Sequence, residues 1–296
     1  MGTLKEKSDY TREALVRLRE LVNESRVERG GDPFPLDAPL KEVVEAVQPG
    51  APIESKLTTQ QVNELLFSNG ETGGHCVSMP VVNGIQVLWQ DAAGTIPVLS
   101  PGDPIGLRVD TTGNGYDQWQ DISSRRPIWR QDADGVGYID TTDAGTWFNF
   151  TPINLDNGCM FIAGQQTGGS GQMTLLGGNT LGYIRLRSDS VFGKNDASSE
   201  RFIAAPTPLG LNDAPALRVN INSGILRARR SDSTIEHYNT APARSNGLAN
   251  AQHLYIYGPS SGSYVTMHDY GIILREQQVD TALEQSVLNY LAGLRS

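Results

Sequence analysis

Two groups of aromatic and polar residues have the chemistry needed to bind a sugar. Aromatic rings stack on the C–H groups of a sugar, and neighbouring carboxylate or amide groups bind its hydroxyls. Tyrosine and tryptophan also fill the cores of β-sandwiches, so a structural role for both groups stays open. The candidate carbohydrate-binding residues are Tyr116, Asp117 and Trp119 in one short run, and Tyr255, Tyr257 and Tyr264 near a Gly-Pro turn.

Residues that could catalyse a reaction are harder to find. Hydrolysis of a glycosidic bond needs two carboxyl groups roughly 5–9 Å apart, but Glu200 and Glu236 are far apart in the sequence and have no acidic partner at strand spacing. The four histidines are scattered along the sequence, which is typical of structural rather than catalytic histidines. We therefore expect no catalytic residue and no enzyme, unless folding brings distant carboxylates together.

Calcium is the one metal that the sequence suggests. Asp132 and Asp134 form a short acidic loop before Gly135, and carboxylate oxygens are ligands that calcium prefers. The loop lacks the longer acidic run and the terminal glutamate of an EF-hand, so a plain hairpin turn is the competing interpretation. We expect no other metal and no other cofactor.

The elements that must position these residues are mostly strands. Between Val81 and Leu274 the sequence is a succession of short apolar or alternating runs, separated by Gly, Asn, Asp and Pro turns. The segment from Gly106 to Asp140 is the clearest example and predicts a meander of short strands. Residues 277–294 return to helical spacing. The pattern predicts a mainly β, antiparallel sandwich that ends in a helix.

The first part of the chain has a different, helical pattern. Three short helices are expected, over residues 8–29, about 36–48 and 57–70, the last with a Thr58–Gln61 capping box and an Asn69-Gly70 stop. We therefore divide the chain into a helical attachment or oligomerisation region, residues 1–74, and a sandwich with its C-terminal helix, residues 75–296. A solvated helix folded back on its own domain is the alternative for residues 8–29. The apolar positions expected to dock partners are Leu15, Leu18, Val22, Leu40, Val43, Val44 and Val47.

Charge and composition exclude several classes. The formal net charge of −9 argues against a nucleic-acid-binding surface, which needs clustered Lys and Arg. The cluster Arg227, Arg229 and Arg230 is expected to be a solvated strand face. No apolar run is long enough to span a membrane, and the N-terminus lacks a signal-peptide pattern. Cys76, in an apparent linker, and Cys159, in an apolar strand, are expected to be free thiols made in a reducing cytoplasm.

One motif in the chain resembles a known family. Its residues are Val109, Asp110, Thr112, Gly113, Asn114, Gly115, Gln120, Arg126, Pro127 and the strand from Gly137 to Asp140. They resemble the opening strands of the concanavalin A-like, or laminin-G-like, jelly-roll modules of tailed-phage virion structural proteins. The ending, with Tyr270 to Leu274 followed by a helix that contains Asn289, Tyr290, Leu291 and Ala292, is similar as well.

The resemblance implies a jelly-roll sandwich displayed on a bacteriophage virion, as a tail-fibre, spike or head-decoration component made in the host cytoplasm. It also implies attachment to host-surface polysaccharide through the lectin-like domain. The N-terminal region would bind other virion proteins and form a homo-oligomer, and no nucleic acid or membrane is involved. A free lectin or carbohydrate-active enzyme with the same fold, and a decoration protein without ligand, are the alternatives.

Overall fold

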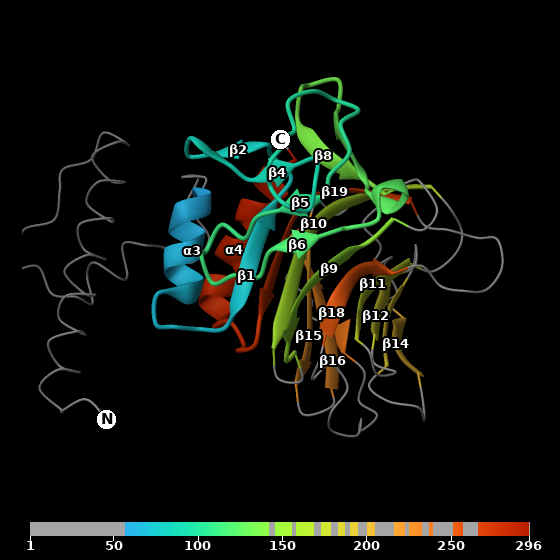
Figure 1. Ribbon diagram of the computed structural model, residues 1–296. Helices are drawn as coiled ribbons and strands as arrows, with labels where there is room; N and C mark the ends of the chain where they lie inside the picture. The colour runs from blue at the N-terminus through green and yellow to red at the C-terminus, as the bar shows by residue number, and fades with distance from the viewer. Residues whose placement is uncertain are drawn as a thin grey trace, which may run out of the picture. The chain divides into compact units, whose positions relative to one another are not determined.

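The computed structural model describes residues 57–141, 146–155, 158–168, 173–178, 183–186, 190–194, 200–204, 216–222, 225–232, 237–238, 251–256 and 266–295. In this part of the chain, two large antiparallel sheets and a small hairpin form a β-sandwich (Figure 1). The prediction of a mainly β, antiparallel sandwich with a C-terminal helix is confirmed.

The first sheet has eight described strands in the order β17-β16-β15-β10-β19-β8-β7, with β1 also paired to β19. The strands of this sheet are β17 (His237–Tyr238), β16 (Ile225–Arg230), β15 (Ala216–Asn222), β10 (Cys159–Gly168), β19 (Thr266–Arg275), β8 (Gly137–Asp140), β7 (Ile128–Gln131) and β1 (Gly73–Val77). Cys76, expected in a linker, therefore lies in a buried strand.

The second sheet has nine described strands in the order β14-β13-β12-β11-β18-β9-β6-β5-β4. Its strands are β14 (Glu200–Ala204), β13 (Ser190–Lys194), β12 (Tyr183–Leu186), β11 (Met173–Gly178), β18 (Ala251–Ile256), β9 (Phe148–Ile153), β6 (Gln118–Trp119), β5 (Leu107–Arg108) and β4 (Leu88–Trp89). A separate hairpin pairs β2 (Val81–Val82) with β3 (Ile85–Gln86). Its turn, Asn83-Gly84, has positive φ at both residues, as a type I′ turn requires.

The run from Gly106 to Asp140 differs from the predicted meander. It supplies β5 and β6 to the nine-stranded sheet, and β7 and β8 to the eight-stranded sheet. The short 3-10 helix η1 (Ser123–Arg125) separates the two pairs of strands. Pro127 follows it and cannot donate a ladder hydrogen bond. One continuous stretch of sequence therefore links the two layers.

Apolar side chains from the inner faces form the core between the sheets. In β9, Phe148, Phe150 and Ile153 are buried, whereas Asn149 is half-buried and Thr151 is exposed. This is the alternation expected of a strand with one face in the core. Each such buried side chain contributes about 1.5–3 kcal/mol through the hydrophobic effect. Other members of this core are Leu88, Val98, Ile105, Trp129, Ile139, Met160, Ile162, Leu217, Val219, Met267, Ile272 and Leu274.

Two helices pack on the outer face of the eight-stranded sheet. They are α3 (Thr59–Phe67) and α4 (Thr281–Gly293), which lie beside β1 in Figure 1. The predicted capping box is present, because the Thr58 side chain accepts a hydrogen bond from the backbone of Gln61 and the Gln61 side chain accepts one from the backbone of Thr58. The side chains buried between the helices and this sheet include Val62, Leu66, Phe161, Ile273, Val287, Leu288 and Leu291.

The packed unit begins earlier than the division placed at residue 74. Leu57–Ser296 cluster into one compact unit, so α3 and β1 belong with the sandwich. Leu15, Leu18, Val22, Leu40, Val43, Val44 and Val47 lie outside the described residues, and their docking role stays a prediction. Neither described helix has the length and apolarity needed to cross a membrane.

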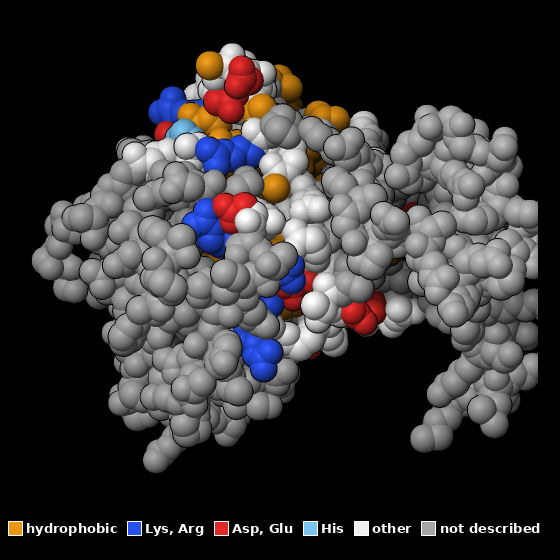
Figure 2. Space-filling model, turned by 180° about the vertical axis from the view of Figure 1, so that it is seen from behind, with side chains coloured by type: hydrophobic (Ala, Val, Ile, Leu, Met, Phe, Trp, Pro, Cys, Tyr) orange, Lys and Arg blue, Asp and Glu red, His pale blue; other side chains and the backbone are white. Residues whose placement is uncertain are grey.

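Ion pairs fix α4 to the sheet and correct the expectation of a solvated arginine face. Glu284 of α4 lies 3.0 Å from Arg218 of β15 and 3.2 Å from Arg229 of β16, and all three side chains are largely buried. Arg230 pairs with Asp232 at 2.6 Å. On the described part of the face in Figure 2, basic and acidic side chains lie next to each other. Arg218 and Arg229 therefore serve to dock α4, whereas Arg230 pairs with Asp232.

Candidate functional site

Asp110, at the centre of the family-like motif, organises the loop that follows β5. Its carboxylate accepts hydrogen bonds from the backbone N–H groups of His75 at 2.9 Å, Thr112 at 3.0 Å and Tyr116 at 3.2 Å, and from the Thr112 hydroxyl. The side chain is 4% exposed. These hydrogen bonds offset the cost of burying the carboxylate. Because the donors come from both β1 and the loop, Asp110 ties the loop to β1.

The glycines and asparagine of the same motif complete this connection. Gly113 and Gly115 have φ near +80°, a conformation that other residues rarely adopt. Asn114 donates to the backbone carbonyl of Gly73 at 3.0 Å. A Cβ on Gly74 would lie 2.5 Å from Cβ of Tyr116, so the loop and β1 can approach this closely only with glycine there.

The last part of the motif also serves the fold. Arg126 donates to the carbonyls of Gln120 at 3.0 Å and Gln90 at 2.9 Å. Gln120 in turn donates to the carbonyl of Trp147 at 2.8 Å. The motif residues thus hold loops and strands in place.

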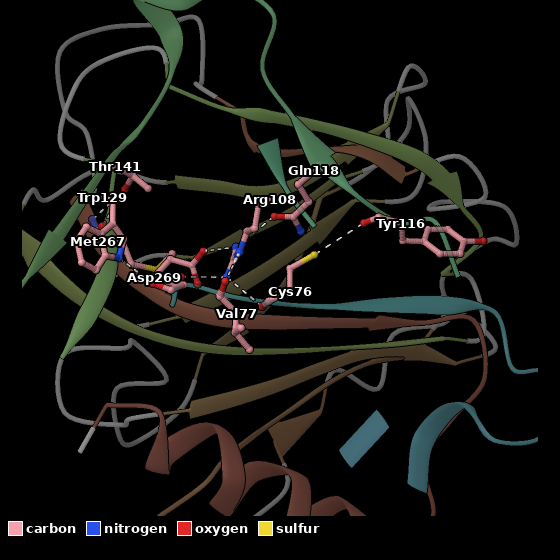
Figure 3. A network of polar contacts seen from close by, with 10 residues as sticks. Cys76, Val77, Arg108, Tyr116, Gln118, Trp129, Thr141, Met267 and Asp269 are labelled. Carbon is pink, nitrogen blue, oxygen red and sulfur yellow. Dashed lines mark hydrogen bonds and ion pairs between the residues drawn. The ribbon is translucent and has the colours of Figure 1, made fainter. Parts of the chain in front are cut away.

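An ion pair between the two sheets lies next to this motif. Arg108 of β5 and Asp269 of β19, both 0% exposed, are joined at 2.7 Å, and we call them the inter-sheet ion pair (Figure 3). Arg108 also donates to the carbonyls of Cys76 and Val77, to the Ser78 hydroxyl and to the Gln118 side chain. Its position inside the core, remote from solvent, indicates a structural role.

A second buried polar group connects the helices to β1. Nδ1 of His75 lies 2.6 Å from Oδ1 of Asn63, and its Nε2 lies 3.2 Å from the Tyr290 hydroxyl. The Tyr290 hydroxyl also lies 2.9 Å from Thr59 Oγ1. Burial, assisted by the nearby Arg108 guanidinium, lowers the pKa of His75 to about 3. His75 is therefore neutral at physiological pH. In this form it links α3, β1 and α4.

The three residues of the first group are all half-buried, and they differ in what their side chains contact. The side chain of Tyr116 packs against the core, and burial raises the pKa of its hydroxyl. Figure 3 shows this ring directed away from Arg108. Asp117 accepts a hydrogen bond from the Asp110 backbone at 2.8 Å. Trp119 is half-exposed on the face of β6 opposite the buried Gln118.

Trp119 has polar and aromatic neighbours on the adjacent strand. It pairs directly with Asn149 of β9, and directly paired residues lie on the same face of a sheet. Trp147 precedes Asn149 by two residues and is also half-exposed, while Phe148 between them is buried. Diagonal neighbours across antiparallel strands lie about 7–8 Å apart. We call the outer surface formed by Asp117, Trp119, Trp147, Asn149 and Thr151 the β6–β9 face.

An arginine lies over one of the two indoles. The guanidinium carbon of Arg125, at the end of η1, is 4.2 Å from the ring centroid of Trp147, which is within the range of a cation–π interaction. Trp147, Asn149 and Arg125 were not identified from the sequence. The alternation in the run from Trp147 to Phe150 could have identified Trp147 and Asn149. If the two phenylalanines point into the core, the residues between and before them lie on the outer face of the sheet.

The second group of candidate residues is only partly described. Leu254 of β18 pairs with Phe148, and His253 pairs with Asn149. Tyr255 is the next residue of β18 after the last position of this register. Tyr257 and Tyr264 lie outside the described residues.

The two glutamates considered for hydrolysis are not brought together in the described part of the chain. Glu200 pairs with Lys194 in the edge strand β14, and Glu236 lies outside the described residues. The order of the sheet puts five strand spacings between β14 and β9, which is about 24 Å at ~4.8 Å per strand. The Glu200 backbone is thus far from the β6–β9 face.

The calcium candidates form a hairpin turn. Asp132 accepts hydrogen bonds from the backbone N–H groups of Asp134 at 3.0 Å and Val136 at 2.9 Å. Gly135 has φ +82° and completes the turn between β7 and β8. In the described ranges, no group of three or more His, Cys, Asp or Glu side chains could hold a metal ion. The geometry thus favours the hairpin interpretation of Asp132 and Asp134.

Comparisons with known proteins give distant similarities of fold. No family model matches the chain, and no curated protein matches it. Solved structures similar to it include botulinum neurotoxin type C, which depends on interaction with two ganglioside molecules to enter cells, with TM-score 0.45 and 11% identity over 75% of this chain and 52% of that one.

Two other solved structures are similar to this chain at a comparable level. One is the binding domain of botulinum neurotoxin serotype D, with TM-score 0.45 and 7% identity over 74% of this chain and 51% of that chain. Another is an arabinofuranosidase complexed with arabinofuranosyl-alpha-1,2-xylobiose, with TM-score 0.43 and 12% identity over 65% of this chain and 51% of that chain. The chain thus spans about half the length of the structures it resembles. At these identities and TM-scores the similarity is too distant to assign a family, a site or an activity.

Proposed function

We propose that the chain is a lectin-like component of a tailed-phage or phage-like particle, and that it binds host-surface glycan through the β6–β9 face. The observation that carries the glycan proposal is the juxtaposition of half-exposed Trp119 and Trp147 with Asn149 on one outer sheet surface. The family-like motif supports the particle proposal.

The chemistry of this face suits a sugar. The Trp119 indole is a flat apolar surface that can stack on sugar C–H groups. Its side chain has only two rotatable bonds, so it loses little conformational entropy when a ligand binds. Asn149 lies directly across from it, on a strand anchored by three buried apolar residues. Such a rigid strand positions polar groups better than a flexible loop does.

Binding without turnover is part of the proposal. Hydrolysis would need a second carboxyl group within roughly 5–9 Å of the first, and Glu200 pairs with a lysine far from the β6–β9 face. We therefore expect purified protein to release no reducing sugar from a polysaccharide to which it binds. Release that is lost in Glu200→Gln would instead support the enzyme alternative.

The test of glycan binding compares Trp119→Ala with a matched surface control. Glycan arrays and calorimetry should show binding by the wild type and at least a tenfold loss in Trp119→Ala, about 1.4 kcal/mol. The control, Ile85→Ala, removes a side chain that is 65% exposed on the β2–β3 hairpin and should bind as the wild type does. Because Trp119 also contacts the core, Trp119→Phe and melting curves separate lost binding from lost stability.

Two results would overturn this proposal: no saccharide bound by the wild type, or equal binding by Trp119→Ala that remains folded. The particle role has its own test. Removing residues 1–56, which precede the compact unit, should leave a folded sandwich that binds glycan but no longer joins particles. Absence of the full-length protein from purified particles would contradict the virion proposal and would favour a free lectin.

A further inference from the structure

We infer that the β6–β9 face selects saccharides that carry a carboxylate group, which Arg125 binds. This inference rests on the proposed glycan-binding function and names the substrate class. It is motivated by the different environments of two adjacent arginines, Arg125 and Arg126.

Arg126 uses three of its five guanidinium N–H donors within the fold. Its guanidinium donates to the backbone carbonyls of Gln90, Gln120 and Asp121. These three bonds join the loop after β6 to the segment after β4. Arg126 is therefore a structural residue and is not available to a ligand.

Arg125 has a different environment, although it is the neighbouring residue. It is exposed, and its guanidinium carbon lies 4.2 Å from the ring centroid of Trp147. No ion pair or hydrogen bond to a described residue uses its N–H donors. A guanidinium has five such donors in a planar fork that matches a carboxylate in two-point contact.

The contact with Trp147 prepares this arginine for binding. An exposed arginine normally samples many rotamers, and a ligand that fixes it loses that entropy. Stacking on the indole restricts the side chain beforehand and leaves the edges of the guanidinium plane open for hydrogen bonds. Trp147 is thus a positioning residue for Arg125, and the half-buried Trp119 is the indole that stacks on the sugar ring.

Because the protein has a net negative charge, binding of an anionic saccharide depends on a local cation such as Arg125. A formal charge of −9 repels an anionic polysaccharide at long range, although physiological salt screens that repulsion beyond about 8 Å. A carboxylate that binds here needs a specific cation within contact distance. Arg125, held over Trp147, supplies one.

The experiment uses saccharide pairs that differ only in whether their carboxyl groups have been reduced to alcohols. Presented on an array and confirmed by calorimetry, the acidic members should bind wild-type protein about tenfold tighter than the reduced members. Arg125→Gln should bind both members of a pair equally, at the affinity of the reduced member. Arg125→Lys should retain part of the preference, because an ammonium keeps the charge but not the planar fork.

The positioning role of Trp147 has a separate readout. Trp147→Ala should lower the acid preference, whereas Trp147→Phe should keep most of it, because a phenyl ring also supports a guanidinium. The control is Arg130→Gln on the other sheet, where Arg130 is ion-paired to Asp140; this variant should behave as the wild type.

The outcomes separate the inference from the proposed function. Saccharides that bind equally before and after carboxyl reduction, with no effect of Arg125→Gln, would overturn the inference and leave glycan binding intact. Preference for sulfate esters over carboxylates on the same backbone would also overturn it. Absence of binding to any member of the panel would overturn the proposed function and this inference together.

Discussion

The inter-sheet ion pair allows a quantitative test of how the sandwich is held together. Arg108 and Asp269 are completely buried and come from different sheets. Removing one partner leaves the other charge in the core without compensation, which typically costs about 3–5 kcal/mol of unfolding free energy. For a packed unit of this size, each kcal/mol corresponds to roughly 2–4 °C in melting temperature. We therefore expect Asp269→Leu to melt roughly 10 °C below the wild type.

The two single variants should differ in how much stability they lose. Arg108 also donates to the carbonyls of Cys76 and Val77 and to the Ser78 hydroxyl. Arg108→Met deprives these groups of that donor, and each buried group left unsatisfied costs about 1–3 kcal/mol. Arg108→Met should thus be more destabilising than Asp269→Leu.

The double variant tests the reasoning directly. Arg108→Met with Asp269→Leu removes both charges, so its loss of stability should be about 3 kcal/mol less than the sum of the single losses. Urea unfolding followed by fluorescence provides the four free energies. The exposed pair Arg130 and Asp140, treated in the same way, should show less than about 1 kcal/mol of coupling. Additive losses at Arg108 and Asp269 would refute the argument that the buried charges compensate each other.

Two further predictions concern the buried polar groups around β1. Because the folded-state pKa of His75 is lowered from 6.5 to about 3, its unfolded form binds more protons below pH 6.5, and stability falls as pH decreases through that window. The loss that His75 causes between pH 7 and pH 5 should be about 2 kcal/mol and should disappear in His75→Gln. Burial also lowers the pKa of His268, so His268→Gln should reduce the pH dependence in the same direction but by less; an unchanged pH slope in His75→Gln would contradict this assignment. Asp110→Ala removes the acceptor for the loop after β5 and should cost about 2–3 kcal/mol in chemical unfolding, whereas Asp132→Ala, in an exposed hairpin, should cost less. Equal small losses in both aspartate variants would show that the loop does not depend on Asp110.

Local sequence signals were sufficient for several elements of the fold. The Thr58–Gln61 capping box predicts where α3 begins, because both partners lie within one helical turn. Asp134-Gly135 indicates a hairpin turn for the same reason. The short alternating runs predict strands and an antiparallel sandwich, which the structure confirms.

The candidate site required information that a short window does not contain. Trp119 was identified from its aromatic type, but its neighbours Asn149 and Trp147 are about 30 residues away and become adjacent only through the pairing of β6 with β9. Tyr116 and Trp119 are both half-buried and both contact the core, and only the strand pairing shows that Trp119 lies across from Asn149. Residue type alone does not reveal which face of a strand is covered.

The sequence by itself determined the type of each element and many of its turns, because these depend on propensities and on contacts within a few residues. The tertiary structure decided which sheet each strand joined, which polar residues were used to hold it, and which remained on the surface. Arg125 and Arg126 illustrate the difference: they are identical neighbours in the sequence, but one donates to backbone carbonyls and the other stacks on an indole. The physical reason is that burial and partner geometry arise from long-range strand pairing, which no local pattern encodes.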